Sequence, residues 1–283
     1  MEKVKFGPSG NDEFFYAEGK KSSLEAPEWL KNKGLSAYEY SFGRGYRMTS
    51  KMAEELGAKA KEHGIELSIH APYYINLANP SDEMAEKSYE YVLTGLKLLR
   101  AMGGRHLVFH IGSESKQDRQ VALDLIDKRL DILIKKIYEK GYDDLYICPE
   151  TMGKQAQIGT YKEIIDFCTK DKILVPTFDF GHIYALNNGN FGSFEDYMEV
   201  FNYAIEKLGY ERVKNCHIHY SKIMYAGKGE VKHLNYTDEG YGPNFDACAK
   251  AIKALKLSPV IICESAGHMS SDALIYKNIY DNI

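Results

Sequence analysis

The sequence has 283 residues, a formal net charge of −4, 44% hydrophobic and 27% charged residues, which is ordinary for a globular protein. This charge excludes a general attraction to nucleic acid but not a local basic surface, because affinity depends on where the charges lie. The five cysteines are widely spaced and form no C-x-x-C pair, which argues against a disulfide framework or zinc ribbon and predicts reduced thiols. The N-terminus has no apolar leader, and no run approaches a membrane span. We therefore expect a soluble, cytoplasmic protein that needs no membrane.

Short apolar runs alternate with segments of helical periodicity along the whole chain. The runs predict strands at residues 3–7, 36–42, 66–70, 106–110, 145–150, 173–179, 213–219 and 260–264. The helices expected after them cover residues 26–34, 50–63, 82–102, 117–140, 161–168, 194–208, 245–255 and 270–282, with Ser81 and Ser193 as caps. Such consecutive units, without a linker, predict an α/β protein, a single-domain (β/α)8 TIM barrel over residues 1–283. The alternative is a doubly wound sheet, but "FGPSGN" at residues 6–11 lacks its glycine-rich phosphate fingerprint.

Ionisable side chains stand at or near the ends of the third to eighth expected strands. They are His70, His110, Glu150, Asp179, His217 and Glu264, followed by His182 three residues after Asp179 and His233 in the long loop after the seventh strand. In a barrel, the carboxyl ends of the strands meet at one mouth. So many acids and imidazoles would be costly to bury there unless cations pair with them. We therefore expect a metal site, and His, Asp and Glu without Cys suit zinc, manganese or iron. For His63, His106 and His268 a structural role is preferred.

Six segments resemble, in order and spacing, the motifs of the endonuclease IV family of apurinic/apyrimidinic (AP) endonucleases. They are "SIHAPYYINLANP", "LVFHIGS", "ICPETMGKQAQIG", "PTFDFGHIYA", "CHIHYSK" and "IICESAG", between about residues 66 and 267. The resemblance implies a barrel that holds three zinc ions. It implies hydrolysis of the phosphodiester 5′ to an abasic site in duplex DNA by metal-activated hydroxide.

The resemblance also implies a role for each ligand-type residue. His70 and His110 would bind the first zinc, and Glu150 would bridge the first and second. Asp179, His217 and Glu264 would complete the second site, and His182 and His233 would bind the third. Glu150 would in addition orient or deprotonate the attacking water, as the catalytic residue.

The third metal site departs from the family pattern. The family has an Asp two residues before its last histidine, where this chain has Val231. Glu230 is the neighbouring candidate, although a shift of one residue in an extended segment turns the side chain to the other side. His219 faces the same side of its strand as His217 and is a second candidate. The third zinc therefore depends on Glu230 or His219, and Mn²⁺ is the alternative metal.

The segment that follows His70 is the expected contact with damaged duplex DNA. The resemblance implies that Tyr73, Tyr74 and Ile75 enter the minor groove at the lesion and fill the base stack. Alternatively, the tyrosines only cap the barrel mouth. Arg44 and Lys222, together with Arg47, Lys228 and Lys232, are candidates for holding phosphates, or are solvated surface charges. We expect the protein to act as a monomer.

Two other functions fit part of the pattern. Related barrels include ketose epimerases and isomerases, which bind one metal ion through Glu, Asp, His and Glu at strands five to eight. The residues Glu150, Asp179, His217 and Glu264 fit that set, with Glu150 and Glu264 as the proton-transferring pair. The surplus histidines argue against this function. The other alternative is a protein that binds DNA lesions or metal but has lost turnover together with its third zinc.

Overall fold

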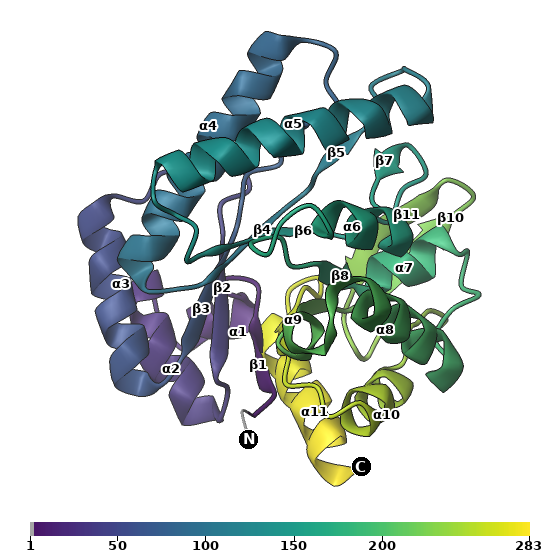
Figure 1. Cartoon of the computed structure of the whole chain (residues 1–283). Helices are drawn as coiled ribbons and strands as arrows, with labels where there is room; N and C mark the ends of the chain where they lie inside the picture. Colours follow the sequence, from purple (N-terminus) through teal and green to yellow (C-terminus); the bar gives the residue numbers. More distant parts are fainter. Residues whose placement is uncertain (1–2) are drawn as a thin grey trace.

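Parallel strands alternate with helices along the chain and close into a barrel (Figure 1). The computed structural model describes residues 3–283, and its barrel strands are β1 (Lys5–Pro8), β2 (Ala37–Ser41), β3 (Glu66–His70), β4 (His106–Phe109), β6 (Tyr146–Pro149), β8 (Thr177–Asp179), β9 (His217–Tyr220) and β12 (Val260–Cys263). They pair in two runs, β2-β3-β4-β6 and β1-β12-β9-β8. Bridges from Ser9 to Glu39 and from Glu150 to Thr177 join the runs at both seams. The predicted TIM barrel is confirmed, and each predicted strand overlaps an observed one.

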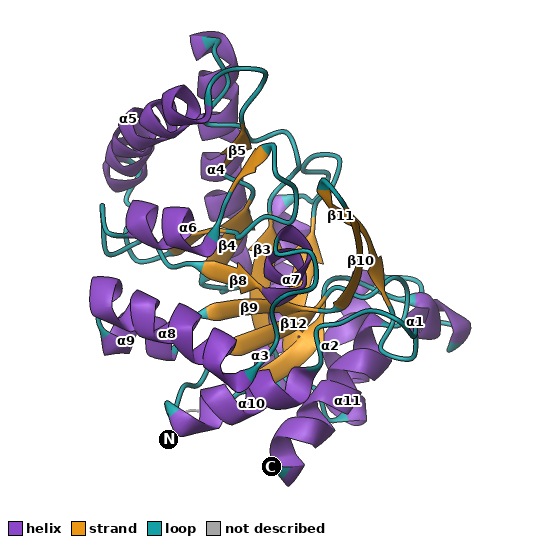
Figure 2. Ribbon diagram, turned by 90° about the vertical axis from the view of Figure 1, so that its right-hand side faces the viewer, coloured by secondary structure: helices purple, strands orange, loops and turns teal. Residues whose placement is uncertain are grey.

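An outer layer of helices surrounds the strands (Figure 2). It consists of α2 (Ala26–Lys33), α3 (Ser50–His63), α4 (Asp82–Met102), α5 (Arg119–Glu139), α6 (Tyr161–Cys168), α8 (Phe194–Leu208), α10 (Phe245–Ala254) and α11 (Met269–Asn282). Both expected caps are present: the Ser81 hydroxyl accepts a hydrogen bond from the amide of Met84, and Ser193 forms a capping box with Asp196. The bounds of α3, α4, α6 and α8 agree with the prediction, because amphipathic repeats with clear caps define their own ends, and even the eight-residue α6 starts at a capping box.

Several short elements were not predicted. They are α1 (Glu13–Ala17), the 3₁₀ turn at Ser23–Glu25, β5 (Gly112–Ser113), β7 (Gln157–Ile158), α7 (Phe180–Leu186), α9 (Tyr210–Lys214), β10 (Lys222–Ala226) and β11 (Gly229–Leu234). β5 pairs with β7, and β10 pairs with β11 as an antiparallel hairpin. The segment expected to be a long loop after the seventh strand is therefore an ordered hairpin. It packs beside α7 at the carboxyl end of the barrel strands (Figure 2).

Polar side chains fill part of the barrel interior, where branched apolar residues are usual. Glu39, Ser68, His217 and His219 are all buried there, on β2, β3 and β9. His217 and His219 point the same way because side chains alternate along a strand, and His219 is the nearer of the two to the carboxyl end. These four residues therefore make the barrel interior polar directly below the barrel mouth.

Two expectations from composition can be compared with the described part of the chain. Cys148, Cys168, Cys216, Cys248 and Cys263 are unpaired thiols, and all of them are buried. Burial raises the pKa of each of these thiols, so they are unreactive core residues. Among residues 3–283, no helix has the length and apolar character that crossing a membrane requires.

Candidate metal centre

Glu150, at the carboxyl end of β6, is the central residue of the site. One carboxylate oxygen, Oε2, lies 3.1 Å from Nε2 of both His70 and His110. The other, Oε1, lies 3.2 Å from Nδ1 of His219 and 3.4 Å from Nδ1 of His182. Burial raises the pKa of the Glu150 carboxyl, but the surrounding imidazoles outweigh burial and hold this pKa well below its usual range. The carboxylate is therefore anionic and is shared among four histidines.

Ligand-type atoms gather in three adjoining groups at this mouth. The first group is His70, His110 and Glu150, the second is Glu150, Asp179, His219 and Glu264, and the third is His182, Glu230 and His233. Within each group the ligand atoms all lie within 4.8 Å of one another. Imidazole nitrogen and carboxylate oxygen without thiolate are a donor set that suits zinc or manganese. Nine residues, counting Glu150 once, can thus hold metal ions at one place.

The turn that follows β8 places two of these side chains together. Asp179 ends the strand and caps α7, because its Oδ1 accepts a hydrogen bond of 2.7 Å from the amide of His182. This cap puts His182 three residues into the turn, with its Nδ1 3.5 Å from Oδ2 of Asp179. The second and third groups are therefore joined by one short stretch of chain, "DFGH".

Hydrogen bonds to main-chain carbonyls fix the tautomer of two of the histidines. Nδ1 of His70 donates to the carbonyl of Ala71 at 2.8 Å, and Nδ1 of His182 donates to the carbonyl of Thr151 at 2.9 Å. A carbonyl oxygen only accepts, so Nδ1 carries the hydrogen, and Nε2 is the atom that His70 turns to the first group and His182 turns to Glu230 of the third. Such anchoring of the outer nitrogen is the usual arrangement around a metal-bound histidine.

The electrostatics of the site also fit a cation. Burial lowers the pKa of His70 and His182, but the carboxylates around them outweigh it and raise these values to about 9 and about 10. Burial raises the pKa of Asp179, whose Oδ2 is buried without a hydrogen-bond partner. The pKa of Glu264 falls to about 2, because the charge of His219 outweighs burial. A cation would satisfy the unpartnered oxygen and replace the protons on the imidazoles.

The structure does not bring His217 into the metal centre. His219 contributes to the second group instead, with Nδ1 3.2 Å from Oε1 of Glu150 and 3.5 Å from Oε2 of Glu264. His217 lies one pleat deeper, where its Nε2 contacts Oε2 of Glu39 at 2.9 Å. His219 therefore takes the place in the second group that the sequence led us to expect for His217, while His217 belongs to a separate group with Glu39 and His219. Both histidines face inward, so the alternation of the strand alone could not separate them.

Glu230 reaches the third group because β11 contains a β-bulge. Tyr225 pairs with Glu230 and Met224 pairs with Lys232, which leaves Val231 without a partner. In a regular strand, two residues three positions apart face opposite sides. The one extra residue of the bulge brings Glu230 and His233 to the same face of the hairpin. Oε2 of Glu230 is 3.4 Å from Nε2 of His182, whereas the side chain of Val231 is exposed. Glu230 thus supplies the carboxylate that the family pattern places at position 231.

Two of the three residues expected to fill the DNA stack are exposed at the mouth. Tyr73 and Tyr74 have 61% and 53% of their surface exposed. The ring of Tyr73 lies 5.6 Å from that of His110, so it stands directly beside the first ligand group. Ile75 is only 3% exposed and packs in the core, so of the three residues only the two tyrosines are presented at the surface.

The basic residues around the mouth differ in their exposure and in whether their side chains already have partners within the fold. Arg44 and Arg47 are exposed in the loop after β2 and line a cavity of about 730 Å³. The ammonium group of Lys222 donates to the carbonyl of Asp238 at 2.8 Å and lies over the ring of Tyr236. The ammonium group of Lys222 therefore already has partners within the fold, and its role as a phosphate contact stays a prediction.

The interpretation of the sequence missed Glu39. It is fully buried on β2, where its carboxylate is close to Ser68, His217 and His219. The available signal was a single charged residue in the middle of the apolar run "SAYEYSF". A buried carboxylate in a strand needs polar partners, which is itself evidence of a polar interior.

The fold and this mouth define a TIM-barrel protein whose carboxyl-terminal face can hold several metal ions around one shared carboxylate. The chain belongs to the xylose isomerase-like TIM barrel family, which matches residues 27–278.

Relatives by sequence are consistent with that assignment. An uncharacterized protein of Methanocaldococcus jannaschii is 31% identical over 262 residues, 92% of both chains. A "Probable endonuclease 4" of Listeria monocytogenes serotype 4b is 29% identical over 242 residues, 81% of this chain and 77% of the relative. The resemblance to endonuclease IV that the motifs indicate is therefore also present at the level of the whole sequence.

Solved structures show the same fold with different chemistries. Endonuclease IV of Thermus thermophilus covers 100% of both chains with a TM-score of 0.71 and 19% identity. A D-tagatose 3-epimerase-like protein covers 99% of this chain and 96% of its own, with a TM-score of 0.70 and 19% identity. At this identity the likeness shows the fold alone, so the reaction has to be argued from the site.

Proposed function

We propose that this protein is a zinc-dependent AP endonuclease of DNA repair that hydrolyses the phosphodiester 5′ to an abasic site in duplex DNA. The observation that supports this most is the presence of three ligand groups in contact with one another through Glu150 and His182. Single-metal sugar chemistry needs only the second group. Sequence relatives that are named as endonuclease 4 support the same proposal.

The ligand groups fit the needs of phosphodiester hydrolysis. Divalent cations bound in adjoining sites lower the pKa of a bound water and neutralise phosphate oxygens. The three groups contain four carboxylates, Glu150, Asp179, Glu230 and Glu264, so three divalent cations with one bound hydroxide would leave one positive charge. The site would therefore attract an anionic substrate. Glu150 lies between the first two groups, where its carboxylate can orient the attacking water or take its proton.

The surroundings of the mouth fit a duplex with a gap in its stack. Tyr73 and Tyr74 present exposed aromatic rings that can replace the missing base. Arg44, Arg47 and Lys228 are exposed and can hold backbone phosphates without reading the sequence. We propose that the protein acts as a monomer in the cytoplasm, which agrees with its unpaired cysteines.

A sugar epimerase or isomerase is the second candidate function. The second group is by itself a complete Glu, Asp, His and Glu set for one metal ion, formed with His219. Its two glutamates, Glu150 and Glu264, would then transfer protons to and from the sugar. Epimerases among the structural neighbours show that this fold can carry such a reaction, whereas the first and third groups would have no purpose in it.

The test is incision of a synthetic duplex that contains one abasic site, by protein purified without chelators and analysed for metal content. We expect about three zinc ions per chain and cleavage of the abasic duplex but not of the intact one. His110→Ala should lower the rate more than about 100-fold, because losing a direct ligand should cost at least as much as losing an outer-shell partner. His63→Ala removes a histidine at the end of α3, outside the site, and should leave the rate unchanged.

Two results would contradict the proposal. One is a folded protein that carries three ions and leaves the abasic duplex intact. The other is conversion of a ketose that requires Glu264 but not His110 or His70, which would establish the epimerase function instead.

A further inference from the structure

Glu39 contacts the metal centre from the barrel interior. Its Oε1 lies 3.0 Å from Nε2 of His219, and its Oε2 lies 2.9 Å from Nε2 of His217. The hydroxyl of Ser68 donates to Oε2 at 2.9 Å. All four side chains are buried, so this carboxylate is held entirely by groups of the protein.

The contact with Glu39 decides which nitrogen of His219 faces the second group. Oε1 of Glu39 and Nε2 of His219 form a close ion pair and not a regular hydrogen bond, since neither atom has a hydrogen-bond partner among residues 3–283. A carboxylate only accepts, and a lone pair on Nε2 would be repelled by the anionic oxygen 3.0 Å away, so Nε2 carries a hydrogen there. In the neutral imidazole the lone pair is then on Nδ1, which faces Glu150 and Glu264 at 3.2 and 3.5 Å. His70 and His182 are anchored in the same way, but by neutral main-chain carbonyls. His219 differs from them because a charged group anchors it.

We propose that Glu39 is a positioning residue that fixes His219 as an Nδ1 ligand and strengthens its hold on the cation of the second group. The inference rests on the proposed function only in requiring a cation there; it does not depend on the reaction. A carboxylate behind a ligating imidazole sets the tautomer and orientation of the ring and raises its basicity. Removing such a partner typically costs about 10- to 100-fold in metal affinity.

Ser68 and His217 have a supporting role in this arrangement. A buried carboxylate with a single donor would be costly, and each of these residues supplies a further hydrogen bond. The two bonds also hold the plane of the Glu39 carboxylate against the ring of His219. His217 therefore supports the metal centre indirectly, through its hydrogen bond to Glu39, although it is not a ligand of the second group.

A cation bound directly by Glu39, His217 and His219 is the competing arrangement, because their ligand-type atoms also lie within 4.8 Å of one another. The 2.9 Å separation between Nε2 of His217 and Oε2 of Glu39 is a hydrogen bond, and the 3.0 Å separation between Nε2 of His219 and Oε1 of Glu39 is an ion-pair contact. Two ligands of one tetrahedral zinc, with bonds of about 2.1 Å, would be about 3.4 Å apart. Both observed separations are shorter than that, which favours direct contact between the side chains over a shared ion.

The experiment measures metal binding without DNA. Zinc affinity is determined by competition with a chromophoric chelator, and the visible absorption of the cobalt(II)-substituted protein reports the geometry of the sites. Glu39→Gln removes the charge, and Glu39→Leu also removes the acceptor. We expect one ion per chain to bind about 10- to 100-fold more weakly, with the larger loss for Glu39→Leu, and a changed cobalt spectrum. Glu66→Gln, at the opposite end of the barrel, is the matched control and should leave both readouts unchanged.

The outcomes separate positioning from other roles. Wild-type affinity and spectrum in folded Glu39 variants, even with a lowered melting temperature, would overturn the inference in favour of a structural role. A fourth ion that is lost in His217→Gln, while the ion of the second group stays, would overturn it in favour of the competing cation site. If neither Glu39 variant folds, His217→Gln decides, with a smaller loss of the same ion supporting the inference and no loss overturning it. A protein that fails to cut abasic DNA but loses one ion in Glu39→Gln would refute the proposed function and leave this inference standing.

Discussion

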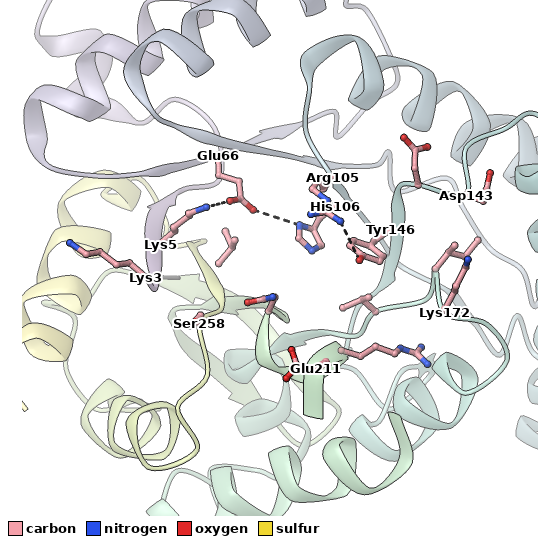
Figure 3. Close-up of a pocket in the computed structure, with 16 residues that line it drawn as sticks. Lys3, Lys5, Glu66, Arg105, His106, Asp143, Tyr146, Lys172, Glu211 and Ser258 are labelled. Carbon is pink, nitrogen blue, oxygen red and sulfur yellow. Dashed lines mark hydrogen bonds and ion pairs between the residues drawn. The ribbon is translucent and has the colours of Figure 1, made fainter. Parts of the chain in front are cut away.

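His106 shows how different the two ends of the barrel are at the scale of single residues. It starts β4 and lies in the wall of a cavity of about 670 Å³ at the amino ends of the strands, with Lys5, Glu66 and Arg105 around it (Figure 3). Burial lowers the pKa of His106 to about 3, with the positive charge of His217 and Arg105 adding to the effect. His70, His182 and His219 of the metal centre have carboxylates around them, and their pKa values are raised. The structural role expected for His106 fits these surroundings.

The lowered pKa of His106 predicts that this residue makes the free energy of unfolding depend on pH in the acid range. Between pH 6.5 and 3 the unfolded chain binds a proton on this residue and the folded chain does not, so the free energy of unfolding falls as the pH falls. At pH 5 the loss is about 2 kcal/mol. In urea unfolding of the metal-free protein, His106→Gln should lose about 2 kcal/mol less than the parent between pH 7 and pH 5. Equal losses in the two proteins would show that the imidazole is not held neutral.

Individual residues also show where a sequence stops being informative. The order of acids and histidines along the chain predicted a metal site at one mouth, because parallel strands have all their carboxyl ends on the same side. The choice between His217 and His219 depends on depth along the barrel axis, which the closure of the strands sets. The burial of Ile75 beside two exposed tyrosines likewise depends on how the loop packs, not on its composition.

At the scale of elements, the β10–β11 hairpin carries a prediction of its own. Val231 is the extra residue of the bulge, so deleting it leaves a regular strand in which Glu230 and His233 are still on one face. We expect the deletion variant to keep the metal ion of the third group, whereas Glu230→Gln should lose it. Metal content per chain after gel filtration measures both variants.

One outcome of the Val231 deletion would contradict this prediction. If deleting Val231 releases the ion as Glu230→Gln does, the bulge itself shapes the site, and a regular strand cannot replace it. Val231→Ala keeps the length of the hairpin and serves as the control, since this side chain is exposed.

The elements that the sequence predicted well are those with long repeats. Helices of 14, 21 and 15 residues, α3, α4 and α8, have enough turns for an apolar stripe and a cap at the expected place. The seven-residue α7 and the two strands of the hairpin are too short to show a period, yet they carry His182, Glu230 and His233. The third ligand group was therefore the least predictable part of the site.

At the scale of the whole molecule, metal binding should contribute to the stability of the barrel. Each ion that binds only the folded chain adds about 2.7 kcal/mol when its free concentration is 100 times its dissociation constant. We expect the chelated protein to melt at a lower temperature than the zinc-loaded one, measured by calorimetry at constant pH. Glu264→Gln, which removes a ligand of the second group, should show a smaller difference. An identical melting temperature with and without zinc would mean that the groups bind no ion tightly.

The distribution of the ligands along the chain also constrains the order of folding events. The second group joins Glu150, which directly follows β6, to Glu264, which directly follows β12. Because β12 is the next-to-last regular element, the second group is incomplete until that strand has docked between β1 and β9. Loop closure over such a separation belongs to a late step of folding. An ion captured by the second group after that step cannot accelerate it. This ion acts by slowing the escape from the folded state, so it should lengthen the lifetime of the folded protein far more than it shortens the time needed to fold.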